Sequence, residues 1–327
     1  MLYYNYCVFC RSPQVYSIQV YFMSRSICAR FLLLLTLLAS GAIAREQPVQ
    51  LMVSIKPLAL IAERIAGDEA QVQTLLPAGV SPHEFALRVS DMRLIRRADL
   101  ALWVGPALEG FLQKPLAGLA PHTVVTAAEL DAIVWPVARG AGHSAQAGHE
   151  GHTHEHGRDP HVWLNPDNAL IIARELAQRL GQLRPSQAQV FSRRAAQFAE
   201  ELAVLDREIT LKLEPVKDRG FAVYHDGYRH FVARYQLKQV DYVTLTPERR
   251  PGARHLYELE KHLQSEAVCL FVEPYADTAA ASALAERAGL RTGILDPLAS
   301  DVAILDYRGL MTGLAAVLAG CLQGANA

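Results

Sequence analysis

Residues 186–214, SQAQVFSRRAAQFAEELAVLDREITLKLE, decide the fold that this sequence predicts. Their apolar residues are spaced alternately by four and three positions, as on one buried face of an α-helix: Phe191, Ala195, Phe198, Leu202, Leu205 and Ile209. Ser186 and Gln189 form a capping-box pattern at the start, and Pro215 prevents continuation. Such a helix would be on the order of 40 Å long, enough to run along two lobes. We expect a stiff connector; the alternative, a coiled-coil dimer seam, lacks an e/g charge pattern.

The sequence on both sides of this helix alternates β-like and helical segments. Before it, strands are expected over residues 51–55, 72–77, 100–105 and 124–126, with helical spacing at 57–66 and 90–97. A further helix is expected to start at Asn165-Pro166-Asp167 and to run to about Leu183. After it, strands are expected over 221–225, 238–245, 268–273 and 292–296, with helices at 255–264, 278–288 and 307–322. This alternation predicts an α/β fold: two lobes, each a parallel sheet flanked by helices, bridged by one long helix. The N-terminal lobe would comprise residues 45–184 and the C-terminal lobe 215–327.

Length and charge restrict the class of protein. The 327 residues suggest about two domains. Lysine and arginine number 32 against 33 acidic residues, so the net charge of −1 argues against a nucleic-acid-binding protein. A hydrophobic content of 51% and a charged content of 20% are typical of a globular core rather than a disordered chain.

The N-terminus has the pattern of an export signal that starts at Met23. Arg25 and Arg30 precede the apolar residues 31–39, and Ala42-Ile43-Ala44 resembles a cleavage site. We therefore expect residues 23–44 to be a signal peptide and residues 1–22 to be an over-extended start. The alternative is a genuine N-terminal extension with an internal anchor. After cleavage, we expect no direct insertion into a membrane.

Two of the five cysteines would remain in the exported chain, Cys269 and Cys321. Two cysteines in an oxidising compartment favour one disulfide. A closed loop of about 50 residues would contribute roughly 3–4 kcal/mol in the chain-entropy model. The alternative is a pair of separate buried thiols.

Three histidines and one aspartate lie near the ends of predicted strands or, for His161, shortly after the low-complexity segment 138–157: His83, His161, His225 and Asp296. Because ligand sites of doubly wound sheets lie outside the carboxyl ends of strands, these residues are expected to converge between the lobes. Three imidazoles and one carboxylate suit Zn²⁺, whereas a second carboxylate in place of one histidine would favour Mn²⁺. Taken singly, each histidine is more commonly a structural residue.

Residues 138–157 form a low-complexity segment for which we expect a mobile loop. Its histidines predict weak metal sites, with a solvated spacer as the alternative: His143, His149, His152, His154 and His156. The other histidines fit exposed or helix-face positions: His122, His230, His255 and His262. Glu273 is expected to line the cleft, or otherwise only to end a strand.

With these residues, nearly the whole chain after the leader resembles the periplasmic zinc-binding proteins of ABC importers (ZnuA type), within the metal-binding solute-receptor superfamily. The resemblance rests on eight motifs: Ser54-Ile55-Lys56-Pro57, Pro82-His83-Glu84-Phe85, Trp103-Val104-Gly105-Pro106, His161-Val162-Trp163-Leu164, His225-Asp226-Gly227-Tyr228, Pro251-Gly252, Glu273-Pro274 and Leu295-Asp296-Pro297-Leu298.

The resemblance implies a ligand set. His83, His161 and His225 match the three zinc histidines of the family. Asp296 matches a metal ligand of manganese-type relatives. In zinc-type members, water or a nearby acid can replace that ligand. Some zinc members carry a glutamate before the first histidine, but Pro82 stands there in this chain. Manganese-type relatives have a carboxylate in place of His225, so the resemblance favours zinc. It also implies that Cys269 and Cys321 are paired.

The expected function is that of a periplasmic receptor that captures Zn²⁺ and delivers it to an inner-membrane ABC permease. We expect the receptor to be a monomer, to have no nucleic acid as a partner and to have no enzyme activity. A manganese receptor of the same superfamily and a periplasmic zinc chaperone are alternatives. A hydrolase is a further one, because three histidines with an open position also describe catalytic zinc. Glu84 is the residue that could act as its general base, although no His-Glu-x-x-His motif occurs.

Overall fold

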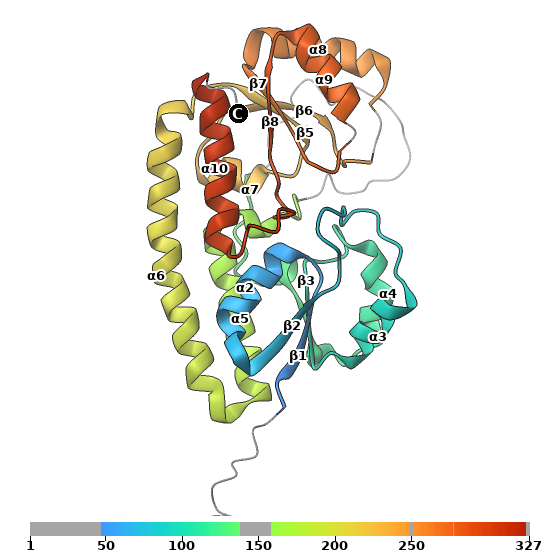
Figure 1. The fold of residues 1–327 in the computed structure, drawn as a ribbon, viewed down its shortest axis with the longest axis vertical. Coiled ribbons are helices and arrows are strands. Elements are labelled where there is room, and N and C mark those ends of the chain that lie inside the picture. Colours follow the sequence, from blue (N-terminus) through green and yellow to red (C-terminus); the bar gives the residue numbers. More distant parts are fainter. Residues whose placement is uncertain (1–46, 138–157, 249–250, 277, 325–327) are drawn as a thin grey trace, which may run out of the picture. The chain divides into compact units, whose positions relative to one another are not determined.

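The long helix α6, Ala188–Leu213, joins the two halves of the chain in this computed structural model. Its buried side chains are those of the predicted stripe, followed by Leu213 at the C-terminal end. α6 packs against α5, Pro166–Leu183, and α10, Tyr307–Gln323. Figure 1 shows α6 along one side of the molecule, beside α5 in one half and α10 in the other. The predicted connecting helix is therefore confirmed. The structure describes residues 47–137, 158–248, 251–276 and 278–324.

The start of α6 differs from the predicted capping box. Pro185–Gln187 form a 3₁₀ turn, and the N-cap residue of α6 is Gln187, whose side chain makes no capping hydrogen bond. Proline fixes its own φ near the helical value, so Ser186 lies inside a turn instead of in the extended conformation typical of a capping serine. The prediction that Ser186 caps α6 is wrong. At the other end, Glu214–Val216 form a 3₁₀ turn at the proline, as expected for the end of a helix.

The first lobe contains a four-stranded parallel sheet in the order β2-β1-β3-β4. Its strands are β1 Val49–Val53, β2 Ala70–Thr74, β3 Leu100–Trp103 and β4 Val124–Thr126. Its helices are α2 Lys56–Ala66, α3 Val89–Arg97 and α4 Gln113–Ala117. Figure 1 shows α2 and α5 on one face of this sheet and α3 and α4 on the other. The predicted strands are present, with some ends shifted by two or three residues.

The second lobe repeats this plan with the strand order β6-β5-β7-β8, again parallel throughout. Its strands are β5 Phe221–His225, β6 Gln239–Thr244, β7 Cys269–Val272 and β8 Arg291–Ile294. Its helices are α7 Arg229–Arg234, α8 Ala253–Glu266, α9 Thr278–Ala288 and α10. The short helix α7 was not predicted. In each sheet the winding reverses between the first and third strands of the lobe, which creates a switch point where ligands of α/β proteins commonly bind.

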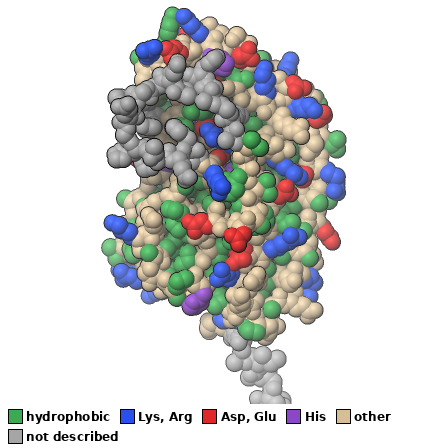
Figure 2. Space-filling model, turned by 180° about the vertical axis from the view of Figure 1, so that it is seen from behind, with side chains coloured by type: hydrophobic (Ala, Val, Ile, Leu, Met, Phe, Trp, Pro, Cys, Tyr) green, Lys and Arg blue, Asp and Glu red, His purple; other side chains and the backbone are tan. Residues whose placement is uncertain are grey.

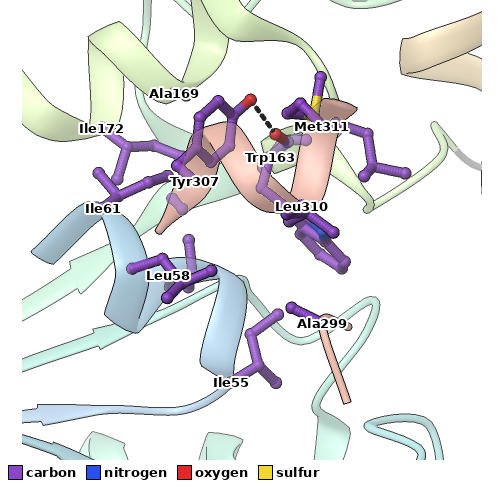
Figure 3. Packing of buried hydrophobic residues seen from close by; sticks show 14 of the residues in the cluster. Ile55, Leu58, Ile61, Trp163, Ala169, Ile172, Ala299, Tyr307, Leu310 and Met311 are labelled. Carbon is purple, nitrogen blue, oxygen red and sulfur yellow. Dashed lines mark hydrogen bonds between the residues drawn. The ribbon is translucent and has the colours of Figure 1, made fainter. Parts of the chain in front are cut away.

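The main hydrophobic core continues from the first lobe into the connecting helices and the second lobe. Figure 3 shows Leu58 and Ile61 beside Ile172, Tyr307 and Leu310. The hydroxyl of Tyr307 donates a hydrogen bond of 2.7 Å to the backbone oxygen of Trp163. A smaller core lies between the second sheet and helices α8 and α9. Because the lobes share apolar contacts, a wide opening between them would expose buried surface to water.

A disulfide joins Cys269 at the start of β7 to Cys321 near the end of α10. Both residues are buried, and 52 positions separate them in the chain. The predicted pairing is therefore confirmed. Among the helices that the structure describes, none combines the length and the hydropathy that crossing a membrane would require. The predicted leader at 1–44 lies outside the described residues.

Candidate metal centre

The second lobe supplies His225 from the switch point of its sheet. His225 is the last residue of the central strand β5, and Glu273 directly follows the neighbouring strand β7. Every residue of β5 is buried, because helices and loops cover both faces of the sheet. The exposed fraction is 1% for His225 and 0% for Glu273. The end of β5 therefore holds an imidazole in a solvent-excluded position, as the strand-end argument predicts.

His161 lies in the segment that leads into α5, directly before the 3₁₀ turn Val162–Leu164. The neighbouring Trp163 is fully buried, and its indole N–H donates to the backbone oxygen of Pro297 at 2.9 Å. The side chain of Asn165 accepts a hydrogen bond from the backbone of Asp167 and so caps α5. These contacts fix the chain that follows His161, and His161 itself is 2% exposed.

His83 lies in the irregular segment between β2 and α3 of the first lobe. Its backbone N–H donates to the hydroxyl of Ser81 at 3.3 Å. Its Nε2 atom is buried and makes no hydrogen bond to the described residues. A buried nitrogen without a partner is costly unless a ligand occupies it.

The structure brings these three histidines together. One ligand atom of each of His83, His161 and His225 lies within 4.8 Å of those of the other two. The ring centroids are separated by 4.9 Å for His161 and His225, 5.0 Å for His83 and His225, and 5.6 Å for His83 and His161. Nitrogens bound to one tetrahedral zinc ion lie about 3.3 Å apart, so small side-chain movements bring this cluster to ligating distance.

A carboxylate holds the far side of the His161 ring. Nδ1 of His161 lies 2.6 Å from Oδ1 of Asp159, and both side chains are buried. Burial alone raises the pKa of Asp159, but the charges of His161 and His230 and the hydrogen bonds from His161 bring it below its usual range. Asp159 is therefore an anion that accepts hydrogen bonds at every pH near neutrality.

A second carboxylate lies behind His225. Nδ1 of His225 is buried without a hydrogen bond to the described residues and lies 3.4 Å from Oε1 of Glu273. The hydroxyl of Tyr228 approaches the same oxygen at 3.0 Å, and it also lies 3.0 Å from the backbone oxygen of Leu295. Burial raises the pKa of Tyr228 well above its usual value, so this hydroxyl stays protonated and serves as a donor. Oε2 of Glu273 has no partner among the described residues.

The cluster favours neutral imidazoles. Burial, together with the nearby His161 and His225, lowers the pKa of His83 to about 2. A histidine with so low a pKa carries a free lone pair at neutral pH, which is the form that binds a metal. Two neighbouring carboxylates and three imidazoles thus give a site that attracts a cation.

Gly227 gives the rings the space they occupy. A Cβ atom at this position would lie 2.5 Å from Cε1 of His225 and 2.9 Å from Cε1 of His161. Both distances are shorter than any ordinary carbon–carbon contact. Glycine is therefore required here because two imidazoles approach its Cα atom from different parts of the chain.

The predicted residue Asp296 is not a member of the histidine cluster in the described chain. Its carboxylate accepts hydrogen bonds from the backbone N–H groups of Leu298 and Ser300, at 3.1 and 2.5 Å, and from the Ser300 hydroxyl at 3.1 Å. These bonds stabilise the turn after β8, and the role of Asp296 as a ligand stays a prediction. Glu84 is exposed and does not belong to the cluster either. The histidines of the predicted weak sites lie outside the described residues: His143, His149, His152, His154 and His156.

The sequence interpretation missed several residues that support the cluster. Asp159 and Tyr228 received no role, and Gly227 appeared only within a motif. His230, expected at an exposed or helix-face position, lies on helix α7 with 1% of its surface exposed, and its Nε2 atom is 2.9 Å from the backbone oxygen of Asp159. The spacing in Asp159-Pro160-His161 is a signal that could have indicated a local carboxylate–imidazole pair.

Comparisons with known proteins identify the family of this chain. Residues 51–321 match the family model of ZnuA, described as zinc-uptake complex component A, periplasmic. A high-affinity zinc uptake system protein ZnuA from Yersinia pestis is 34% identical over 287 residues, covering 83% of this chain and 90% of the relative. One from Haemophilus influenzae is 30% identical over 295 residues, covering 77% and 86%.

Solved structures show the same fold. A crystal structure of ZnuA has a TM-score of 0.71 at 24% identity and covers 86% of this chain and 100% of its own. The crystal structure of Zn(II)-bound AdcA from Streptococcus pneumoniae has a TM-score of 0.68 at 26% identity, covering 86% of this chain and 59% of that one. Since the family model spans most of the sequence and the relatives align over most of their length, this chain belongs to the ZnuA family of periplasmic zinc-uptake components.

Proposed function

We propose that this protein is a zinc receptor that captures Zn²⁺ between its lobes with His83, His161 and His225 and delivers it to the permease of an ABC importer. The observation that carries the proposal is the convergence of three imidazoles from three separate segments, with ligand atoms within 4.8 Å of one another. The buried, unpartnered Nε2 of His83 gives independent support, since an ion would satisfy it.

The donor set fits zinc as the cargo. Zn²⁺ accepts three or four nitrogen ligands in tetrahedral geometry, whereas Mn²⁺ prefers sites richer in oxygen. The second-lobe ligand is His225 rather than a carboxylate, which favours zinc over the manganese alternative. Three histidines leave a fourth position, which we assign to water or to Asp296 after rearrangement of its turn.

Membership of the ZnuA family supports a cellular role in the periplasm. We infer that residues 23–44 direct export to the periplasm and that the receptor works there as a monomer. Release would require the permease to disturb the site, because the shared core and helix α6 limit the relative movement of the lobes. We assign to the five loop histidines a weak, accessory binding of zinc. Figure 2 shows acidic and basic side chains interspersed on the visible face, and the net charge of −1 supports the proposal that nucleic acid is not a partner.

Zinc affinity tests the ligand set. The purified full chain is titrated against a chromophoric zinc chelator, which isolates the tight site from the weak ones. Alanine at position 83, 161 or 225 should weaken tight binding at least about 100-fold. His122→Ala is the matched control, because His122 is exposed and lies outside the cluster. Retention of tight binding by all three variants would reject the site.

Uptake tests the receptor role. A bacterial strain that lacks its own zinc receptor but keeps the permease is supplied with this chain and given radioactive zinc at limiting concentration. The receptor role predicts restored uptake with the intact chain and none with His225→Ala. Tight zinc binding without restored uptake through any ABC permease tested would favour the zinc chaperone.

A further inference from the structure

Asp159 contacts two of the segments that carry the zinc histidines. It is buried, with 5% of its surface exposed. Oδ1 lies 2.6 Å from Nδ1 of His161 and accepts a hydrogen bond from the His161 backbone N–H at 3.0 Å. Oδ2 accepts a hydrogen bond from the backbone N–H of Arg229 at 2.9 Å. Arg229 is the first residue of α7 and follows His225 by four residues, so one carboxylate joins the His161 segment to the end of the loop after β5.

We propose that Asp159 is a positioning residue for zinc binding, which fixes the tautomer and ring orientation of His161 and holds its segment against the loop that follows His225. This inference rests on the proposed function, because it concerns the same site. No described contact places Asp159 in the cluster itself, so it acts through His161 and not as a ligand.

The tautomer argument follows from what each atom can do. An ionised carboxylate only accepts hydrogen bonds, so Nδ1 of His161 must carry the proton that points at Asp159. The lone pair of the neutral ring is then on Nε2, where a metal can bind it. A carboxylate behind a metal-binding histidine also raises its basicity, and loss of such a partner typically weakens metal affinity about 10- to 100-fold.

An asparagine cannot replace both halves of this contact. Its side chain has one acceptor oxygen, whereas Asp159 uses one oxygen for His161 and the other for Arg229. If the amide NH₂ faces His161, the ring must accept at Nδ1 and protonate Nε2, which blocks the metal. If the NH₂ faces Arg229, two donors oppose each other and the loop after His225 loses its tether. Either orientation weakens the site.

The backbone of Asp159 is held independently of its side chain. Nε2 of His230 lies 2.9 Å from the backbone oxygen of Asp159, and Nδ1 of His230 lies 3.2 Å from the side-chain nitrogen of Asn168. These contacts remain when the carboxylate is changed. We therefore expect Asp159→Asn to fold and to affect the histidines more than the overall structure.

The first test measures zinc affinity of the full chain by chelator competition. Asp159→Asn should bind zinc about 10- to 100-fold more weakly than the wild type. Asp206→Asn is the matched control: it makes the same substitution in a carboxylate that bonds Arg234 on α7 without contacting the cluster, and its zinc affinity should stay within about threefold. A folded Asp159→Asn with wild-type affinity would overturn the proposal.

The second test does not depend on zinc binding. Selective ¹⁵N-histidine labelling of the zinc-free wild type, with His161→Ala for assignment, shows by NMR which ring nitrogen carries the proton. The proposal requires protonation of Nδ1 in His161, and a ring protonated at Nε2 would refute it. If the wild type shows the Nδ1 tautomer but no tight zinc binding, the proposed function fails instead, so the two failures are distinguishable.

Discussion

Replacing Gly227 with alanine should remove tight zinc binding while the protein stays folded. The new Cβ atom would lie 2.5 Å from Cε1 of His225 and 2.9 Å from Cε1 of His161. Non-bonded carbons prefer a separation of about 3.5–4.0 Å, so the His225 ring must move by at least about 1 Å or the backbone must shift. Metal–ligand distances tolerate only about 0.2 Å, so one or both histidines leave the ion.

The expected loss of affinity is at least about 100-fold, comparable with removal of a ligand. The cost to stability should be smaller, since inserting a methyl group into a packed site costs about 1–3 kcal/mol and a typical domain has about 5–15 kcal/mol. Chelator competition measures the affinity, and thermal unfolding of the zinc-free protein measures the stability. Gly110→Ala is the control, because nothing lies within 4 Å of a Cβ atom there. If Gly227→Ala is folded and binds zinc within about threefold of the wild type, the assigned site is wrong.

Three further predictions concern charge, pH and the disulfide. Glu273→Gln keeps the shape of the side chain but removes the negative charge behind His225, and chelator competition should show about tenfold weaker zinc binding. The folded-state pKa of His83 is lowered from 6.5 to about 2, so between these pH values the folded protein binds fewer protons than the unfolded chain. The stability of the zinc-free protein should therefore fall as the pH decreases through this range. Thermal unfolding at several pH values should show the wild type losing roughly 1 kcal/mol per pH unit relative to His83→Ala; a constant difference would contradict this reasoning. Serine at both Cys269 and Cys321 should lower the free energy of unfolding by about 4 kcal/mol in denaturant titrations, and unchanged stability would refute that contribution.

The fold was predictable because the local pattern of apolar residues in the sequence matches the burial of the strands and helices in the structure. Strands β5 and β7 are short apolar runs between helical segments. They are apolar throughout because both faces of a parallel sheet are covered by helices. The spacing of apolar residues in α6 predicted which face is buried. The capping prediction failed because Pro185 begins a 3₁₀ turn that includes Ser186. The capping-box pattern considers only Ser186 and Gln189 and so ignores the preceding proline.

The three histidines could be identified from the sequence, but the residues that hold their rings in place could not. Their position at strand and loop ends suggested a shared site, and the family resemblance made that assignment specific. The contacts behind the rings join residues far apart in sequence, such as Asp159 with Arg229 and Tyr228 with Glu273. No periodicity or local motif encodes a pairing across 70 or 45 positions.

Asp296 illustrates the limit of strand-end reasoning. Its position after β8 is where a ligand of the second lobe would be expected, yet its carboxylate bonds to the backbone of its own turn. An aspartate before Pro297 can stabilise a turn as readily as it can bind a metal, and the two uses share the same local sequence.

The most direct measurement is a crystal structure of the zinc-loaded protein with anomalous data collected on both sides of the zinc absorption edge. The account predicts one strong peak between the lobes, with a nitrogen of His83, His161 and His225 each about 2.0–2.1 Å from it. A zinc peak elsewhere, or one bound by fewer than two of these imidazoles, would contradict it.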